Sequence, residues 1–335
     1  MTKIAIIGAG AIGSVVGAFL SRAGEDVTLV GRRDHMGAIR QNGLHVEGRA
    51  GAFSATVNTA EALNFKPDYA LLTVKTQDVL KALKANREFL KDTQLVTFQN
   101  GMRSDGLAAS LLPKSQIASA VVNISATYLT PGAVTVVYPG TLVIGHPFPQ
   151  NDQPLEPVAA LLRPAAPVTI SGNIQGVHWL KLLFNLNNAF PALLNTGLHE
   201  LYRYAYMRQL AARVIREGLR TVQGAGVQLE SLPEVSVRLF QVLGMLPAPL
   251  AGLLIASRAR RIEGQWPLLG STLQSLRRGR PTEIDYLNGE IVRLGAETGK
   301  PTPLNAALVE MVHEVEHSGE FMSLERLRSR MNAVR

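Results

Sequence analysis

The spacing of hydrophobic residues changes about halfway along the chain. In the first half, short apolar runs of β-forming residues recur, and the clearest are residues 3–7, 26–30, 68–74 and 94–98. Continuous runs of this length are typical of strands buried on both faces of a parallel sheet. Because helices or loops fill the spaces between them, we predict a doubly wound, Rossmann-type α/β sheet over this half.

Three further apolar stretches follow before the middle of the chain. They are residues 117–129, 134–138 and 142–145, and Pro-Gly pairs at 131–132 and 139–140 interrupt them. Since proline followed by glycine is typical of tight turns, we expect these strands to be antiparallel.

The second half is helical in its spacing almost throughout. The change follows a loop at residues 171–173, so we predict an α/β domain over residues 1–173 and an all-helical domain over residues 174–335. The longest apolar stretch, residues 239–256, contains two prolines, two glycines and a glutamine. It therefore predicts amphipathic helical pieces, packed on the helical domain or on a second subunit, rather than a membrane span.

A glycine motif follows the first strand. The residues are Gly8, Ala9, Gly10, Ala11, Ile12 and Gly13, a complete G-x-G-x-x-G that opens a predicted helix. Strand, glycine turn, helix and second strand within about 30 residues form the context of a dinucleotide-binding fingerprint. A signal peptide is the alternative, but the glycines have fingerprint spacing and no small-residue cleavage site follows a basic segment. We predict cofactor contacts at Gly8, Gly10, Ala11, Ile12 and Gly13.

The end of the second strand indicates which dinucleotide binds. NAD sites place an acid there to hold the ribose hydroxyls, whereas NADP sites replace the acid by arginine. Here the strand ends in Val30-Gly31-Arg32-Arg33. The acid is missing, so we predict NADP(H) as the cofactor and Arg32 as the contact for its 2′-phosphate, the alternative being that both arginines are solvated loop residues.

Composition narrows the possible sites and locations. The 335 residues include no cysteine, which excludes disulfides, thiolate metal sites and a cysteine nucleophile, and which fits a cytoplasmic protein. The formal net charge of +8 suits anionic ligands, and it does not by itself indicate nucleic acid. We expect a small anionic substrate, neither a nucleic-acid nor a membrane partner, and we leave a homodimer open.

Two segments of the helical half carry candidate chemistry. At helical spacing, Lys181, Asn185, Asn188 and Asn195 fall on one face of an otherwise apolar helix. Such polar groups need partners, and these are either neighbouring helices or a ligand. Further on, a Gly-Arg-Pro turn predicts a helix that carries Glu283 in its first turn, where a solvated capping acid is the common role.

These motifs together resemble the ketopantoate reductase (2-dehydropantoate 2-reductase) family. The resemblance extends from Ile4 to about Val315, and the further segments that carry it are Val74-Lys75, Gln99-Asn100-Gly101-Met102, Trp179-x-Lys181 with Asn185, Ser271, and residues 282–289. It implies a Rossmann domain and an all-helical domain similar to the C-terminal domain of 6-phosphogluconate dehydrogenase, with the active site in the cleft between them. It also implies NADPH-dependent reduction of a 2-oxo acid, ketopantoate, in pantothenate and coenzyme A biosynthesis.

The resemblance implies roles for individual residues. Lys181 corresponds to the general acid that protonates the ketone oxygen, and Glu283 to the catalytic partner that holds lysine and substrate. Asn185 and Ser271 correspond to substrate ligands, while Asn100 and Lys75 correspond to contacts on the cofactor side.

The sequence departs from the family pattern at two substrate positions. The second helix asparagine of the family is Ala189 here, with Asn188 adjacent, and an asparagine three residues before the serine is Leu268. We expect Asn188 to replace the displaced asparagine as a substrate contact. These departures favour, as an alternative, a related reductase or dehydrogenase that acts on another oxo or hydroxy acid.

Three other functions fit less well. Residues 313–317 match the zinc motif H-E-x-x-H, but no third ligand is evident, so we predict no metal and explain the motif as a charged helix face. A non-catalytic NADP(H)-binding regulator would not need the pair Lys181 and Glu283. Nucleic-acid binding would rest only on the arginines near residues 258–261 and 277–280.

Overall fold

The computed structural model describes residues 1–262 and 270–334, and the chain divides into two compact units, Met1–Val177 and His178–Arg335. The division falls inside helix α6 (Ile174–Asn185), just after the loop where the spacing of apolar residues changes. Each unit is described by itself.

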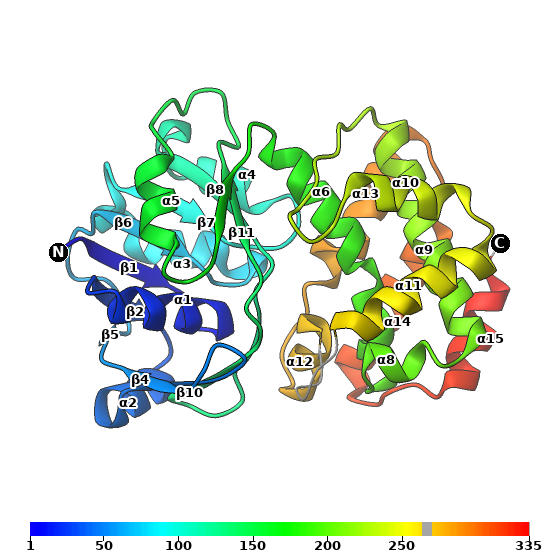
Figure 1. The fold of residues 1–335 in the computed structure, drawn as a ribbon, viewed down its shortest axis with the longest axis horizontal. Coiled ribbons are helices and arrows are strands. Elements are labelled where there is room, and N and C mark those ends of the chain that lie inside the picture. Colours follow the sequence, from blue (N-terminus) through cyan, green and yellow to red (C-terminus); the bar gives the residue numbers. More distant parts are fainter. Residues whose placement is uncertain (263–269, 335) are drawn as a thin grey trace. The chain divides into compact units, whose positions relative to one another are not determined.

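The first unit contains an eight-stranded sheet in the order β12-β11-β8-β7-β6-β1-β2-β5 (Figure 1). Its strands are β1 (Lys3–Ile7), β2 (Asp26–Val30), β5 (Asn58–Ala60), β6 (Tyr69–Leu72), β7 (Gln94–Thr97), β8 (Ile117–Val122), β11 (Leu142–Gly145) and β12 (Val168–Ile170). All neighbours pair parallel except β8 and β11, so the predicted doubly wound parallel sheet is confirmed. Because the order runs outward from β1 in both directions, a ligand-binding switch point lies beyond its carboxyl end.

A second, four-stranded sheet has the order β4-β3-β10-β9. Its strands are β3 (Leu44–Gly48), β4 (Phe53–Ala55), β9 (Ser125–Thr127) and β10 (Ala133–Tyr138). The antiparallel expectation is correct for β8 with β11 and for β9 with β10, but β8 also pairs parallel with β7, and β10 pairs parallel with β3. The turn residues determine where the chain reverses and so which neighbouring strands pair antiparallel. The second partner of each strand comes from a distant part of the sequence, and turn residues do not indicate it.

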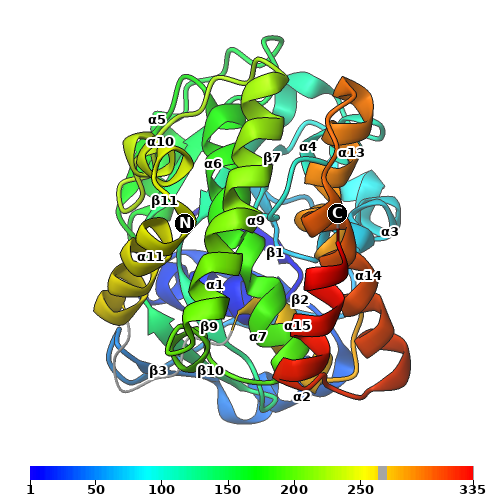
Figure 2. The same ribbon diagram turned by 90° about the vertical axis from the view of Figure 1, so that its right-hand side faces the viewer.

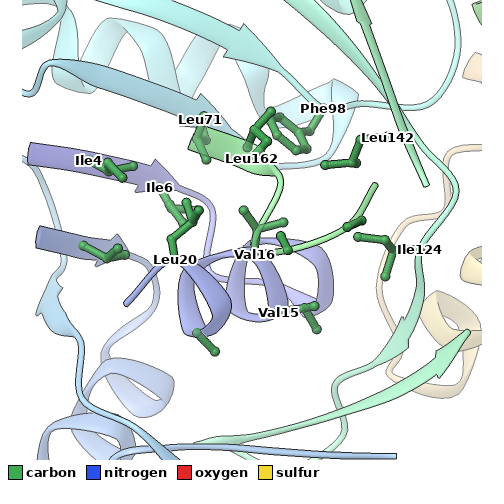
Figure 3. Close-up of a cluster of buried hydrophobic side chains, with 14 of the residues drawn as sticks. Ile4, Ile6, Val15, Val16, Leu20, Leu71, Phe98, Ile124, Leu142 and Leu162 are labelled. Atoms are coloured by element: carbon green, nitrogen blue, oxygen red, sulfur yellow. The ribbon is translucent and has the colours of Figure 1, made fainter. Parts of the chain in front are cut away.

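Alternate residues of β1 enter two different cores. Ile4 and Ile6 pack with residues of α1 and α5 on one face, as the cluster in Figure 3 shows, while Ala5 and Ile7 pack with residues of α3 and α4 on the other. The helices of this unit are α1 (Ala11–Arg22), α2 (Arg33–Asn42), α3 (Val79–Asn86), α4 (Ser104–Ala109) and α5 (Glu156–Leu162), with 3-10 turns at Thr76–Asp78, Arg87–Leu90 and Lys114–Gln116. Burial on both faces explains the unbroken apolar run of this strand.

Every regular element among the described residues of the second unit is a helix. Its helices are the greater part of α6, then α7 (Ala189–Leu194), α8 (Leu198–Leu201), α9 (Ala205–Gly224), α10 (Val237–Met245), α11 (Ala248–Ile262), α12 (Ser271–Arg277), α13 (Asn288–Thr298), α14 (Pro303–Ser318) and α15 (Leu324–Ala333), with 3-10 turns η4 (Leu186–Asn188) and η5 (Ile284–Tyr286). Figure 2 shows α9 between α10 and α11 on one side and α13 to α15 on the other. A Cβ at Gly218 of α9 would come within 2.6 Å of Leu186 Cδ1, so glycine permits the close approach of α9 to η4.

The apolar stretch at residues 239–256 forms most of α10 and α11, which confirms the predicted helical pieces. Both helices pack against α9, and Phe240 and Leu243 are buried, whereas Met245, Leu250 and Leu253 are exposed. No helix in the described ranges 1–262 and 270–334 has the length and hydropathy needed to cross a membrane.

The glycine turn allows a stability prediction. A Cβ on Gly13 would lie 2.4 Å from Gly8 O and 2.6 Å from Thr73 Oγ1, whereas a Cβ on Gly10 would meet no atom within 4 Å. Gly13→Ala should therefore lower the free energy of unfolding by about 1–3 kcal/mol, as overpacking does. Gly10→Ala should lower it by less than about 1 kcal/mol, since only helix capping changes. Urea unfolding measures both, and equal losses would contradict the assignment of close packing to Gly13.

Candidate active site

The glycine turn presents a helix N-terminus to open space. Gly8 adopts φ +116°, which favours glycine, and its amide donates to Val30 O at 2.9 Å. The first turn of α1, all of it described, carries no acidic side chain, and nothing within 4 Å occupies the position of a Cβ on Gly10. Ala11 and Ile12 continue this turn and are half-buried. The free space and the positive end of the helix dipole fit the pyrophosphate of a dinucleotide.

The two arginines after β2 have different surroundings. Arg33 forms an exposed ion pair with Glu61, Nε to Oε1 3.2 Å. Arg32 is exposed at the N-cap of α2, and in the described part of the chain its side chain has no hydrogen-bond or ion-pair partner. A Cβ on Gly31 would lie 2.9 Å from Ala9 Cβ, so a side chain there would crowd the glycine turn. Of the two arginines, Arg32 is the one whose guanidinium is available to an anion.

Lys75 and Asn100 lie beyond the carboxyl ends of two paired strands. Leu72 of β6 pairs with Thr97 of β7, and both chains continue past the sheet. The Gln99 side chain donates to Leu72 O at 2.8 Å and to Val74 O at 2.9 Å, and Thr76 Oγ1 donates to Asn100 O at 3.3 Å. These bonds hold the two half-buried residues near each other at the ligand-binding edge of the sheet.

Helix α6 carries Lys181. The helix begins after Asn173, whose side chain accepts from Gly176 N at 3.0 Å and so caps the N-terminus. Lys181 Nζ lies 5.1 Å from the centre of the Phe184 ring. Desolvation by burial lowers the pKa of Lys181 to about 8, although the negative charge of Glu234 opposes this shift. An ammonium with this pKa is protonated at neutral pH and can release its proton readily.

Asn185 and Asn188 lie where the helix is interrupted. The chain changes from α6 to the 3-10 turn η4 before α7 begins, and Asn188 Nδ2 donates to Asn185 Oδ1 at 3.4 Å. Asn195 does not join them, because it ends α7 in a left-handed conformation and its Oδ1 accepts from Arg277 Nε at 2.8 Å. Ala189 is buried, whereas Asn188 is half-buried, so position 188 is the more accessible of the two.

A buried amide network supports this interruption. Asn288 Nδ2 donates to Leu186 O at 3.2 Å and to Asn305 Oδ1 at 2.9 Å, and Asn305 Nδ2 donates to Glu217 Oε1 at 2.8 Å. Both asparagines are 0% exposed. The network satisfies the carbonyl of Leu186, the first residue of η4, and stabilises the turn between Asn185 and Asn188. Sequence reasoning did not identify these supporting residues, although Asn288 belongs to the segment at residues 282–289.

Ser271 and Glu283 lie on two other segments. Ser271 is exposed as the first residue of α12, and a Cβ on the preceding Gly270 would be 3.3 Å from Asn188 Cγ. The structure thus brings the start of α12 close to Asn188. Leu268 lies outside the described residues.

The expectation for Glu283 is wrong in its local structure. Glu283 precedes the short turn η5, and α13 begins only at Asn288. Leu287, with φ −115° and ψ −94°, separates the two elements, so Glu283 does not lie in the first turn of a helix. Its side chain is half-buried.

Comparison with known proteins identifies the family. The family profile "Ketopantoate reductase PanE/ApbA" matches residues 4–147, and its C-terminal counterpart matches residues 173–316. A 2-dehydropantoate 2-reductase of Pyrococcus horikoshii is 30% identical over 95% of this chain and 98% of its own length. The chain belongs to the ketopantoate reductase family. It is an oxidoreductase, as the sequence motifs predict.

Solved structures of this family have the same fold. A PanE/ApbA family ketopantoate reductase from Ralstonia eutropha is 30% identical, with a TM-score of 0.78 over 94% of this chain and 98% of its own. A 2-dehydropantoate 2-reductase from Geobacter metallireducens is 25% identical, with a TM-score of 0.79 over 93% and 99%. D-mandelate dehydrogenase in complex with NADH is 25% identical, with a TM-score of 0.77 over 94% and 99%. This ketopantoate reductase family member therefore has the fold of enzymes that use a nicotinamide dinucleotide.

The influence of Glu234 on Lys181 can be tested directly. Glu234→Gln removes the charge that raises the pKa of Lys181, so that pKa should fall below about 8. The pH dependence of Lys181 acetylation, followed by mass spectrometry, measures the change. Glu230→Gln, in the same segment, is the matched control and should leave the profile as it is in the wild type. Superimposed profiles for Glu234→Gln and the wild type would contradict the assigned influence.

Proposed function

We propose that this chain is an NADPH-dependent 2-dehydropantoate 2-reductase that acts in the cytoplasm and supplies pantoate for pantothenate and coenzyme A biosynthesis. The observation that carries the proposal is Lys181, whose ammonium has a pKa lowered to about 8 and lies on the helix that also carries Asn185. Relatives of nearly full-length coverage that are 2-dehydropantoate 2-reductases support the substrate.

Lys181 acts as the general acid. NADPH, when bound, supplies the hydride that is added to the ketone carbon of the substrate. Lys181 Nζ donates a proton to the ketone oxygen as negative charge develops there, and its positive charge stabilises that oxygen beforehand. Because the pKa is near neutral rather than near 10.5, the ammonium is the stronger acid while it remains protonated at neutral pH.

Amide and hydroxyl groups orient the substrate. Asn185 and Asn188 present neighbouring amides, and Ser271 follows the segment that contacts Asn188. Amide N–H and hydroxyl groups donate hydrogen bonds to a carboxylate and to a substrate hydroxyl. The Glu283 carboxylate accepts hydrogen bonds from the Lys181 ammonium and from the substrate, and so holds the two in place.

The first unit holds the cofactor. The N-terminus of α1 binds the pyrophosphate, and Lys75 and Asn100 bind beyond β6 and β7. Arg32 binds the 2′-phosphate, which distinguishes NADPH from NADH. Because Arg33 is paired with Glu61, Arg32 is the arginine that binds the 2′-phosphate.

A second candidate substrate is another 2-oxo acid. At position 189 the family pattern has an asparagine, but this chain has a buried alanine, so the side chain at 189 offers the substrate no hydrogen bond. Asn188 supplies an amide instead, from a different direction around the helix. The similarity to D-mandelate dehydrogenase, at 25% identity, supports an aromatic 2-oxo acid such as phenylglyoxylate.

A substrate panel separates the two candidates. The purified protein is mixed with NADPH and either 2-dehydropantoate, phenylglyoxylate or a short aliphatic 2-oxo acid, and the loss of NADPH absorbance gives kcat/KM for each. We expect the highest value for 2-dehydropantoate. A higher value for phenylglyoxylate would favour the second candidate, and no NADPH oxidation with any acid would refute both.

The cofactor assignment predicts a selective loss. Arg32→Ala should raise KM for NADPH much more than KM for NADH, because only NADPH carries the 2′-phosphate. Initial rates with both cofactors measure this effect. Arg33→Ala is the matched control and should change the ratio little, since Arg33 pairs with Glu61. If Arg32→Ala affects both cofactors equally, Arg32 does not read the phosphate.

The general acid predicts a kinetic and a pH effect. Lys181→Ala should lower kcat by roughly 10²–10⁴ while NADPH binding is retained, because a positioned proton donor is lost. In the wild type, ketone reduction should fall as pH rises through the lysine pKa of about 8, and alcohol oxidation should rise over the same range. Near-normal kcat in Lys181→Ala would point to another donor, and His178 would be tested next.

A further inference from the structure

A set of side chains around His313 joins the end of α14 to the turn that carries Glu283. His313 Nδ1 lies 2.7 Å from Glu316 Oε2, and His313 Nε2 lies 3.0 Å from Asp285 Oδ1. The second oxygen of Glu316 accepts from Thr282 N at 2.6 Å. We call Thr282, Asp285, His313 and Glu316 the His313 clamp. His313 and Glu316 belong to the H-E-x-x-H stretch, and their contacts give that motif a structural role.

The clamp holds both sides of Glu283. Thr282 precedes it and Asp285 follows two residues later, and each is bound to α14 through the clamp. Within the turn, Ile284 N donates to Thr282 Oγ1 at 3.2 Å and Tyr286 N donates to Glu283 O at 3.0 Å. Glu283 precedes a single 3-10 turn rather than lying inside an α-helix, so the bonds of Thr282 and Asp285 to α14 anchor the chain on both sides of it.

The clamp is complete only when the His313 ring carries two protons. Each ring nitrogen faces a carboxylate oxygen, and only the imidazolium donates from both nitrogens, whereas the neutral ring donates from one. Among the residues that the structure describes, the charged groups that face the ring are Asp285 in η5 and Glu316 on α14 itself. Partial burial lowers the pKa of His313, but the hydrogen bonds and charges of Asp285 and Glu316 together outweigh burial and raise it above its ordinary value.

The partner carboxylate is shifted in the matching direction. Burial raises the pKa of Glu316, but the hydrogen bonds from Thr282 and the bond and charge of His313 outweigh burial and lower it. Glu316 is therefore ionised wherever His313 is protonated in the neutral range, and the clamp is a charge-assisted pair.

We propose that His313 is a positioning residue for Glu283: its doubly protonated ring ties Asp285 to Glu316 and thereby fixes the turn that presents the Glu283 carboxylate. This inference rests on the proposed function, which gives Glu283 its role beside Lys181. Since the pKa of His313 is raised on folding, the stabilisation is complete below the ordinary histidine pKa and is lost as pH rises through the raised value.

The experiment compares two histidines on one helix face. His313→Gln removes the two-sided bridge, whereas His317→Gln, four residues later, changes an exposed ring whose Nδ1 contacts the His313 carbonyl oxygen at 2.7 Å. Steady-state kinetics with NADPH and the 2-oxo acid substrate give kcat, KM and NADPH affinity for both variants, alone and combined with Glu283→Gln. His313→Gln should lower kcat severalfold and leave NADPH affinity unchanged. His317→Gln should retain the wild-type kcat. In the Glu283→Gln background, His313→Gln should cause no further loss of kcat.

Two results would overturn the proposal while the proposed function stands. One is wild-type kcat in His313→Gln, and the other is the same fold loss with and without the Glu283 carboxylate, which would indicate a general structural role. Wild-type activity in Glu283→Gln would instead remove the role of Glu283 and the proposal with it.

A titration of the His313 ring by NMR tests the clamp without catalysis. The wild-type ring should titrate above the ordinary histidine pKa, and Asp285→Asn should lower that value because one facing charge is lost. A ring that titrates at the ordinary value and ignores Asp285→Asn would show that the clamp does not form, and it would overturn the proposal.

Discussion

The proposed chemistry depends on the partial desolvation of one ammonium group, that of Lys181. A lysine side chain in water holds its proton too tightly to give it up at neutral pH, and desolvation weakens that hold. In Lys181 the shift brings the pKa to about 8, while the charge of Glu234 limits it. In the proposed reaction, this balance would keep Lys181 charged when the substrate binds and make it acidic enough to protonate the ketone oxygen.

Lys181 lies on α6, close to the point where that helix changes to the 3-10 turn η4, and a network of buried side chains holds this change in place. The change from α6 to η4 places the amides of Asn185 and Asn188 close together, and it alters the regular helical pairing of the backbone carbonyls there. The buried side chain of Asn288 satisfies one of these carbonyls, and Asn305 and Glu217 complete the network. The hydrogen bonds of this network stabilise one arrangement, and they offset the cost of burying the amides of Asn288 and Asn305, which are both 0% exposed.

The sequence predicted most of the fold because its signals are local. The apolar runs of the strands, the glycine turn and the change of spacing near residue 173 all reflect burial within one element. The site was predicted less completely. Spacing and resemblance predict Lys181 and Asn185 as site residues. Glu234, Asn288 and the contacts of His313 join segments far apart in the chain, so no local pattern indicates them. The prediction of a helix around Glu283 was wrong for the same reason. The bonds of Thr282 and Asp285 to α14 are long-range, and they hold this segment in a 3-10 turn.

Direct titration of Lys181 tests the central claim. The protein is labelled with 15N-lysine, the Lys181 ammonium signal is assigned by its absence in Lys181→Arg, and its chemical shift is followed against pH. We predict a midpoint near pH 8, well below the ordinary lysine value of 10.5. A midpoint near the ordinary lysine value of 10.5 would contradict this prediction, because Lys181 would then be neither desolvated nor adjusted for proton transfer.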